Sequence, residues 1–298
     1  MPDFHSLRQT VSPKLQLAGL VGRVGYHVGK ERLTRPRPTS LRQVPPSPES
    51  LTTEWLTQAL CDGTPDAAVL GYELGARNDG TSARRTMRVV YNDAGRAAGL
   101  PEAVFTKSGP TFLNRMVGAG AGLARVESSF YSHVRPLLDI ETPTTLYSAY
   151  DPVSHRQMLI TDDVAVTRGA SFGDARTRTL TREQTEQIID ALATLHARFW
   201  DAPLRRMYGH WLQNAYEVTQ TLNVTIGAAA RILSGFERAR DVIPAQVYAR
   251  RGEVHGALMR SQDLSANPLS SPEQLSIAGA KDGARGSLTA LDEFSPPL

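Results

Sequence analysis

A lysine at the end of a predicted strand and a glutamate in the predicted helix that follows could together bind the phosphates of a nucleotide. Lys107 ends the strand-like stretch 102–107, and Glu127 lies early in a helical stretch that begins at Leu123. Sites that bind phosphoryl groups use a fixed cation and a carboxylate that orients it. Taken singly, the two residues are equally typical of a solvent-exposed lysine and a solvent-exposed helical glutamate, so their meaning depends on the surrounding pattern.

A polar turn could supply the backbone N–H groups that such a site also needs. Between the strand-like stretches 68–74 and 85–91, the chain runs through the glycine-containing segment 75–82. The candidates to cover phosphates are Gly80, Thr81 and Ser82. A generic hairpin turn uses the same residue types, so the turn alone does not decide between the two interpretations.

The order of the predicted elements indicates an antiparallel sheet followed by helices. Alternating and apolar patterns predict strands over 68–74, 85–91, 102–107, 145–150 and 157–161. Helical spacing predicts helices over 50–60, 123–138, 181–200, 211–232 and 244–261. The glycine-rich stretch Val117–Gly122 leads into the helix 123–138, and Pro136 should end or kink that helix.

Composition restricts the class of protein. The chain has 298 residues, of which 41% are hydrophobic and 21% charged, and it can form one large or two small domains with a real core. Its single cysteine, Cys61, can form neither an internal disulfide nor a cysteine metal cluster by itself, which favours a reducing, cytoplasmic setting. Residues 268–298 contain almost no aromatic or β-branched side chains, so we expect this tail to be disordered.

The first 43 residues carry much of the positive charge. Eight Lys and Arg against two acidic residues give this arm a charge of +6 (8 minus 2), whereas the whole chain carries +3. The apolar part, Leu15–Val28, is too short and too polar to span a bilayer and lacks the order of a secretory signal. We expect residues 1–47 to form a flexible or loosely docked leader with a Pro-rich linker. An amphipathic helix on an anionic membrane surface is the alternative, and the arm's poor aromatic content does not favour specific nucleic-acid recognition.

Taken in order, these features resemble the aminoglycoside phosphotransferase and ecdysteroid-kinase-like group of small-molecule kinases. The matching stretches lie within about residues 48–267 and are Asn78–Ser82, Ala103–Lys107, Glu127–Tyr131, Leu159–Val164 and Leu192–Trp200. The resemblance implies an α+β, protein-kinase-like fold with a five-stranded antiparallel N-lobe over residues 48–164. An incomplete, mostly helical C-lobe would follow over residues 165–267. The implied activity is ATP-dependent phosphoryl transfer, with Mg²⁺, to a hydroxyl of a small molecule.

The resemblance also assigns roles to individual residues. Lys107 would pair with Glu127 and hold the α- and β-phosphates of ATP. The hinge whose backbone reads the adenine edge would consist of Ile160, Thr161, Asp162 and Asp163. His196, within the second helical stretch of the match, is expected to be a helix-packing residue.

The catalytic segment that the resemblance requires has no clear match in this chain. In the family, a His-Gly-Asp-x-x-x-x-Asn run supplies the base for the substrate hydroxyl and a ligand for Mg²⁺. The segment 255–258 has alanine at the base position, 263–267 has its Asp and Asn one residue too close, and 292–294 follows no strand pattern. We therefore expect no catalytic residue, no metal ligand and essentially no kinase activity.

Three hypotheses stay open. The first is a member of this kinase family whose catalytic segment has been cut off near Pro268 by truncation or a frameshift, which would leave apolar helix faces exposed. The second is a pseudokinase-like module that binds nucleotide or a partner at Lys107 and Glu127 without turnover. The third is a peripheral surface-binding protein that uses residues 1–43. The pattern predicts neither the acceptor substrate nor the oligomeric state.

Overall fold

The computed structural model describes residues 13–172, 179–200, 211–213, 215–254, 256–257 and 260. Contacts divide the chain into two compact units, Met1–Gln213 with Thr221–Ile226 and Asn214–Gln220 with Gly227–Leu298. The predicted tail 268–298, and the segments 263–267 and 292–294 that partly imitate a catalytic run, lie outside the described residues. His255, which begins the third such segment, also lies outside them.

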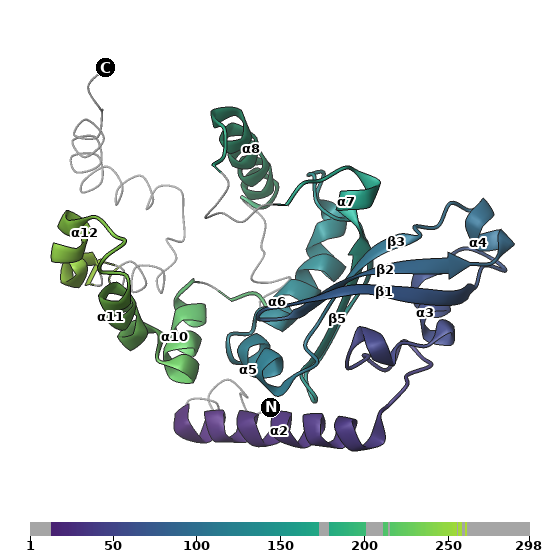
Figure 1. The fold of residues 1–298 in the computed structure, drawn as a ribbon, viewed down its shortest axis with the longest axis horizontal. Helices are drawn as coiled ribbons and strands as arrows, with labels where there is room; N and C mark the ends of the chain where they lie inside the picture. Colours follow the sequence, from purple (N-terminus) through teal and green to yellow (C-terminus); the bar gives the residue numbers. More distant parts are fainter. Residues whose placement is uncertain are drawn as a thin grey trace. The chain divides into compact units, whose positions relative to one another are not determined.

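The first unit is built on a five-stranded antiparallel sheet, as the sequence predicts. The strands are β1 (Val69–Asp79), β2 (Ala83–Tyr91), β3 (Ala103–Ser108), β4 (Thr145–Asp151) and β5 (Arg156–Asp162). They lie side by side in the order β1-β2-β3-β5-β4, with every neighbouring pair antiparallel (Figure 1). The α+β fold class is therefore confirmed, and β3 occupies the centre of the sheet.

Strand β1 is longer than predicted. The polar residues 75–79, expected in a turn, continue the strand after a bulge between Leu74 and Arg77. A bulge lets a strand accommodate an irregular segment without leaving the ladder. As a result, the hairpin between β1 and β2 turns only over residues 80–82.

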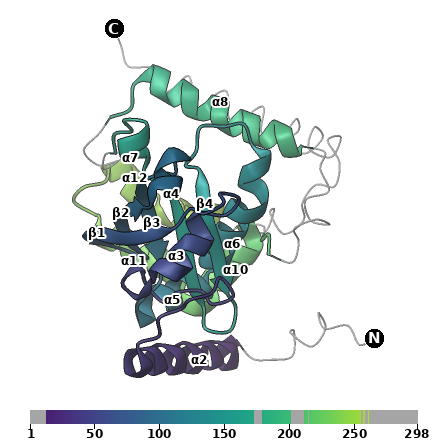
Figure 2. The same cartoon turned by 90° about the vertical axis from the view of Figure 1, so that its right-hand side faces the viewer.

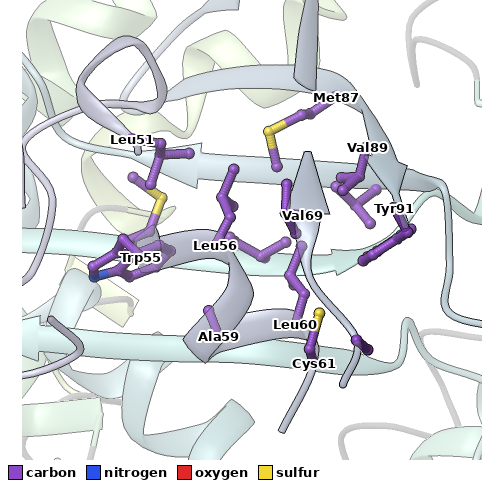
Figure 3. Close-up of a cluster of buried hydrophobic side chains, with 14 residues drawn as sticks. Leu51, Trp55, Leu56, Ala59, Leu60, Cys61, Val69, Met87, Val89 and Tyr91 are labelled. Atoms are coloured by element: carbon purple, nitrogen blue, oxygen red, sulfur yellow. The ribbon is translucent and has the colours of Figure 1, made fainter. Parts of the chain in front are cut away.

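One face of the sheet is covered by a short helix and forms the main core. Helix α3 (Thr53–Leu60) follows a single 3₁₀ turn, η2 (Pro48–Ser50), and begins at Thr52, whose hydroxyl accepts a hydrogen bond from the Trp55 N–H. Figure 3 shows the α3 side chains facing the strands. The fully buried residues of this core include Leu51, Trp55, Leu56, Met87, Val89, Tyr91, Val104, Met158 and Ile160. A further short helix, α4 (Asp93–Ala97), replaces the predicted turn after β2.

The segment between β3 and β4 differs from the predicted single helix 123–138. It consists of α5 (Phe112–Gly120), α6 (Leu123–Ser129), a π-helical turn η3 (Phe130–Val134) and a 3₁₀ turn η4 (Arg135–Leu137). Helix α5 includes most of the glycine-rich stretch, which the sequence does not predict to be helical. Gly122, with φ +68°, separates α5 from α6, and Pro136 lies in the last turn, where the helical segment ends.

The N-terminal arm forms an ordered helix, in contrast to the expected flexible or loosely docked leader. Helix α2 (Pro13–Thr34) lies beside α5 in both views (Figures 1 and 2). Val24, Val28 and Glu31 are buried in this contact. The leader interpretation of residues 13–34 is wrong because these three side chains give the helix an inner face. Within the described residues, no helix is long and apolar enough to cross a membrane.

After the sheet, the chain is helical. In the first unit, α7 (Val164–Thr167) follows β5 directly, and α8 (Arg182–Phe199) begins with a capping box formed by Thr181 and Gln184. The predicted helix 211–232 is two helices, α10 (Ala215–Ile226) and α11 (Ala228–Arg238), because Gly227 adopts φ +62° and interrupts the helical backbone. Helix α12 (Ala245–Ala249) follows in the second unit.

Candidate functional site

The alternation of side chains along β3 determines which face Lys107 occupies. Val104 and Thr106 are fully buried on the α3 face, so the residues between and after them point to the opposite face. The register places Lys107 opposite Arg84 of β2 and Leu159 of β5. Lys107 therefore lies on the central strand, on the face that α6 covers.

Lys107 and Glu127 are brought together as the sequence predicts. The Lys107 Nζ lies 2.5 Å from Glu127 Oε1, and the two side chains are 27% and 28% exposed. The ion pair is thus partly buried. Each side chain keeps part of its surface open to solvent, and α6 carries the carboxylate of the pair.

Gln157 also binds the carboxylate of this ion pair, and it was not among the predicted site residues. Its side-chain amide donates to Glu127 Oε2 over 2.8 Å, so both carboxylate oxygens of Glu127 are engaged. Gln157 is buried on β5, two residues before Leu159 and therefore on the same sheet face as Lys107. The two-residue period of β5, combined with the strand order, would have identified it.

Arg84 adds a second cation to the same face. It is exposed, and its position opposite Lys107 on β2 places the two residues side by side on the same sheet face. Its Nη2 donates to the Asn78 side-chain oxygen of β1 over 3.3 Å. Arg84 was not among the predicted site residues, although it lies only two residues after Ser82, the last residue of the predicted phosphate-binding turn.

The predicted phosphate-covering turn lies at the tip of the β1–β2 hairpin. The Gly80 N–H donates to the Ser82 carbonyl over 3.0 Å, so this particular amide is used within the turn. The Asn114 amide of α5 donates to the Gly80 carbonyl over 3.1 Å and ties the tip to that helix. The exposed Thr81 and the half-buried Ser82 are the candidates that this arrangement favours for contact with phosphate oxygens.

The four predicted hinge residues lie at the end of β5 and are all buried. Ile160 belongs to the apolar core on the α3 face. The amides of Asp162 and Asp163 donate to the carbonyls of Thr144 and Ala103, each over 3.1 Å. Since these two amides are engaged, adenine recognition at this segment would depend on backbone carbonyl groups. The Asp162 carbonyl accepts from the Thr161 hydroxyl over 3.1 Å, and its oxygen has a second lone pair that could accept another hydrogen bond.

The two acidic side chains of this segment have structural partners. Asp162 accepts from the Thr144 N–H over 2.6 Å and from Arg168 over 2.9 Å. Asp163 caps α7 by accepting from the Ala165 N–H over 3.1 Å. These contacts explain why two consecutive aspartates can be buried at a strand end.

A separate apolar cavity of about 480 Å³ lies between the α6–η3 segment and α8. It is lined by Val126, Phe130, Val134, Leu195, His196, Phe199, Trp200, Trp211 and Leu212. His196 thus lines an apolar surface and makes no approach to Lys107 that the described contacts record. Ile188 and Leu192, which also belong to α8, are 47% and 49% exposed.

Comparisons of the chain with protein-family models, with curated proteins and with solved structures found no match. The kinase-like resemblance is therefore an expectation that rests on the quoted sequence stretches alone. Among the described residues, no group of three or more His, Cys, Asp or Glu side chains could hold a metal ion.

Proposed function

We propose that this chain is a nucleotide-binding module of the kinase-like type, related to the aminoglycoside phosphotransferase and ecdysteroid-kinase-like group. In this proposal Lys107, oriented by Glu127, binds the α- and β-phosphates of ATP. The observation that carries the proposal is the partly buried Lys107–Glu127 ion pair between the central strand of a five-stranded antiparallel sheet and the helix that covers it.

The position of the pair distinguishes it from an ordinary surface salt bridge. A solvent-exposed Lys–carboxylate pair contributes only about 0–1 kcal/mol and needs no further support. Lys107 instead lies on the central strand, and Glu127 is held from its other oxygen by the buried Gln157. Such support fixes the amine in place, and a pre-positioned cation is what phosphate binding requires.

The charge of this sheet face favours an anion. Lys107 and Arg84 are neighbours across two strands and contribute two positive charges, whereas the Glu127 carboxylate that pairs with Lys107 contributes one negative charge. Arginine and lysine side chains are the common protein partners of phosphate oxygens. The exposed Thr81 at the hairpin tip adds a hydroxyl group in the turn that precedes the strand of Arg84.

We propose binding without phosphoryl transfer for the chain as given. The Mg²⁺ that accompanies ATP in the resembled kinases does not find a fitting donor set among the described residues, because the Glu127 oxygens are engaged by Lys107 and Gln157. No step is therefore assigned to a metal. A hydroxyl-bearing small molecule is the acceptor class that the resemblance implies, and its identity is open. A cytoplasmic site of action fits a nucleotide ligand and the free Cys61.

Thermal unfolding with and without ATP tests the proposal. Ligand at about 100 times its Kd stabilises a protein by about 2.7 kcal/mol, which corresponds to several degrees in Tm. We expect ATP to raise the Tm of the wild-type chain and of Arg88→Met, an exposed basic position on the same strand as Arg84. The Tm of Lys107→Met should rise by about half as much or less, because a tenfold weaker Kd leaves ATP at only about 10 times its Kd. An unchanged Tm in the wild type, or equal shifts in both variants, would contradict the proposal.

A further inference from the structure

Helix α2 presents two different faces. Its inner face packs against the first unit through the buried Val24, Val28 and Glu31. Its outer face carries three large apolar side chains, Leu15, Tyr26 and Leu33, which are 66%, 63% and 86% exposed. These residues are 11 and 7 positions apart, close to whole numbers of helical turns, so they form one line along the outside of the helix.

The exposed charge around this line is basic. Arg23, Lys30 and Arg32 of α2 are exposed, as are Arg35, Arg37 and Arg42 in the segment that follows. Glu31 is the only acidic residue in the sequence between positions 4 and 48. It is buried and paired with Arg115 and Arg156, so it does not offset the exposed basic residues.

We propose that the outer face of α2 docks onto the surface of a membrane that contains anionic lipids. The helix would lie in the plane of the bilayer. Leu15, Tyr26 and Leu33 would enter the headgroup region, while the flanking Arg and Lys side chains contact lipid phosphates. This surface binding needs no spanning segment, and within the described residues no helix could span a membrane.

The docked state of α2 strengthens this binding. A disordered amphipathic segment must fold when it meets a membrane, and the ordering of its backbone opposes binding. Because Val24, Val28 and Glu31 already hold α2 as a helix, its outer face is formed before contact. Protein sites that bind single-stranded nucleic acid combine basic residues with aromatic side chains on which bases stack. The outer face of α2 instead has three apolar residues at its centre, two of them leucines, which favours lipid over nucleic acid.

The test is co-sedimentation of the full chain with vesicles. The vesicles contain phosphatidylcholine either alone or with about 30% phosphatidylserine, at salt concentrations of about 0.1 M and 0.5 M. We expect binding only to the anionic vesicles, with weaker binding at high salt. Each neutralised basic residue should lower the affinity roughly fivefold, so Arg23→Gln with Lys30→Gln should lower it about 25-fold.

Further variants separate the apolar contribution from the effect of charge. Leu15→Ser with Leu33→Ser should also weaken vesicle binding, whereas Leu70→Ser should not, since Leu70 is 62% exposed on β1, away from α2. No binding to anionic vesicles, or binding unaffected by both α2 double variants, overturns the proposal. Tighter binding to duplex DNA that is insensitive to the leucine changes would assign the face to nucleic acid and overturn it as well. A concentration-dependent dimer that Leu33→Ser abolishes would assign it instead to a second copy of the chain.

Deletion of residues 1–43 is not a suitable test of this surface. It would remove Glu31 and leave the fully buried Arg115 guanidinium without its carboxylate. A buried charge that loses its partner is strongly destabilising. The point variants above keep Glu31 and the inner face of α2, so a loss of vesicle binding can be separated from a loss of folding by the unchanged Tm of each variant.

Discussion

Arg115 of α5 is fully buried and binds the Glu31 carboxylate of α2 through both terminal nitrogens of its guanidinium. Arg115 Nη1 lies 2.8 Å from Glu31 Oε1, and Nη2 contacts Oε2. Arg156 of β5 donates to Glu31 Oε1 over 2.9 Å. Arg115 also donates to the Gly109 carbonyl over 2.9 Å. One carboxylate thus links the N-terminal helix to the sheet and to the helix that supports the hairpin tip.

Removal of this carboxylate should be costly. We predict that Glu31→Gln lowers the free energy of unfolding by about 3–5 kcal/mol, because it leaves two guanidiniums close together with no opposite charge. Urea unfolding followed by circular dichroism measures the loss. Glu186→Gln is the matched control, since Glu186 pairs with Arg182 on the exposed surface of α8 and should cost about 0.5 kcal/mol or less. Equal losses in the two variants would contradict the buried role of Glu31.

The same carboxylate predicts an acid-sensitive stability. Burial by itself raises the pKa of Glu31, but the Arg115 and Arg156 guanidiniums outweigh burial and hold the pKa below its ordinary value of 4.5. A carboxyl group whose pKa is lower in the folded than in the unfolded state stabilises the fold above the unfolded pKa. That contribution is lost as the pH falls below 4.5 toward the folded pKa.

Urea midpoints measured from neutral pH down to about pH 3 test this dependence. The wild-type midpoint should fall steeply below about pH 5. The midpoint of Glu31→Gln, already low at neutral pH, should change less over the same interval. If the urea midpoints of the two proteins fell equally as the pH decreased, Glu31 would not contribute to the loss of stability in acid.

Gly75 of β1 lies against Thr86 of β2, within the bulge between Leu74 and Arg77. A β-carbon at position 75 would clash with the Thr86 hydroxyl and lie 3.4 Å from the Thr86 carbonyl oxygen. We predict that Gly75→Ala costs about 1–3 kcal/mol of stability. Gly71→Ala, in the same strand with no atom within 4 Å of its added β-carbon, should change stability by less than about 0.5 kcal/mol.

A double variant identifies the cause. Thr86→Ala in the Gly75→Ala background removes the clashing hydroxyl and should recover part of the lost stability, which a double-mutant cycle would detect as a favourable coupling. Additive losses would mean that Gly75 is required for another reason, such as the backbone conformation at the bulge.

The strands and the central ion pair could be predicted from the sequence. The alternation Met87, Val89, Tyr91 of buried residues on β2 follows the period-2 pattern directly, and Lys107 ends a strand of the same kind. The pairing of Lys107 with Glu127 came from the family resemblance and from the order of the elements. Gln157 and Arg84 were missed because their roles depend on the strand order β2-β3-β5, which a single-strand pattern does not reveal.

Helices α2 and α5 were harder to predict because tertiary contacts outweigh local propensity. Helix α5 includes glycines that lower helix propensity, but Thr111 caps it and Arg115 fixes it through Glu31. Helix α2 has an apolar inner face of few residues, so its sequence resembles a loosely docked leader. The decisive contact joins Glu31 to Arg115, residues far apart in the chain, and no local pattern reports it.

Isothermal titration of the full chain with ATP and with adenosine tests the central claim most directly, because the claim concerns the phosphates. We predict that the wild-type chain binds ATP more tightly than adenosine. Lys107→Met should weaken ATP binding at least about tenfold, since it removes a charge-assisted contact, and should leave adenosine binding unchanged. Equal ATP affinities in the wild type and in Lys107→Met, or no ATP binding at all, would contradict the account.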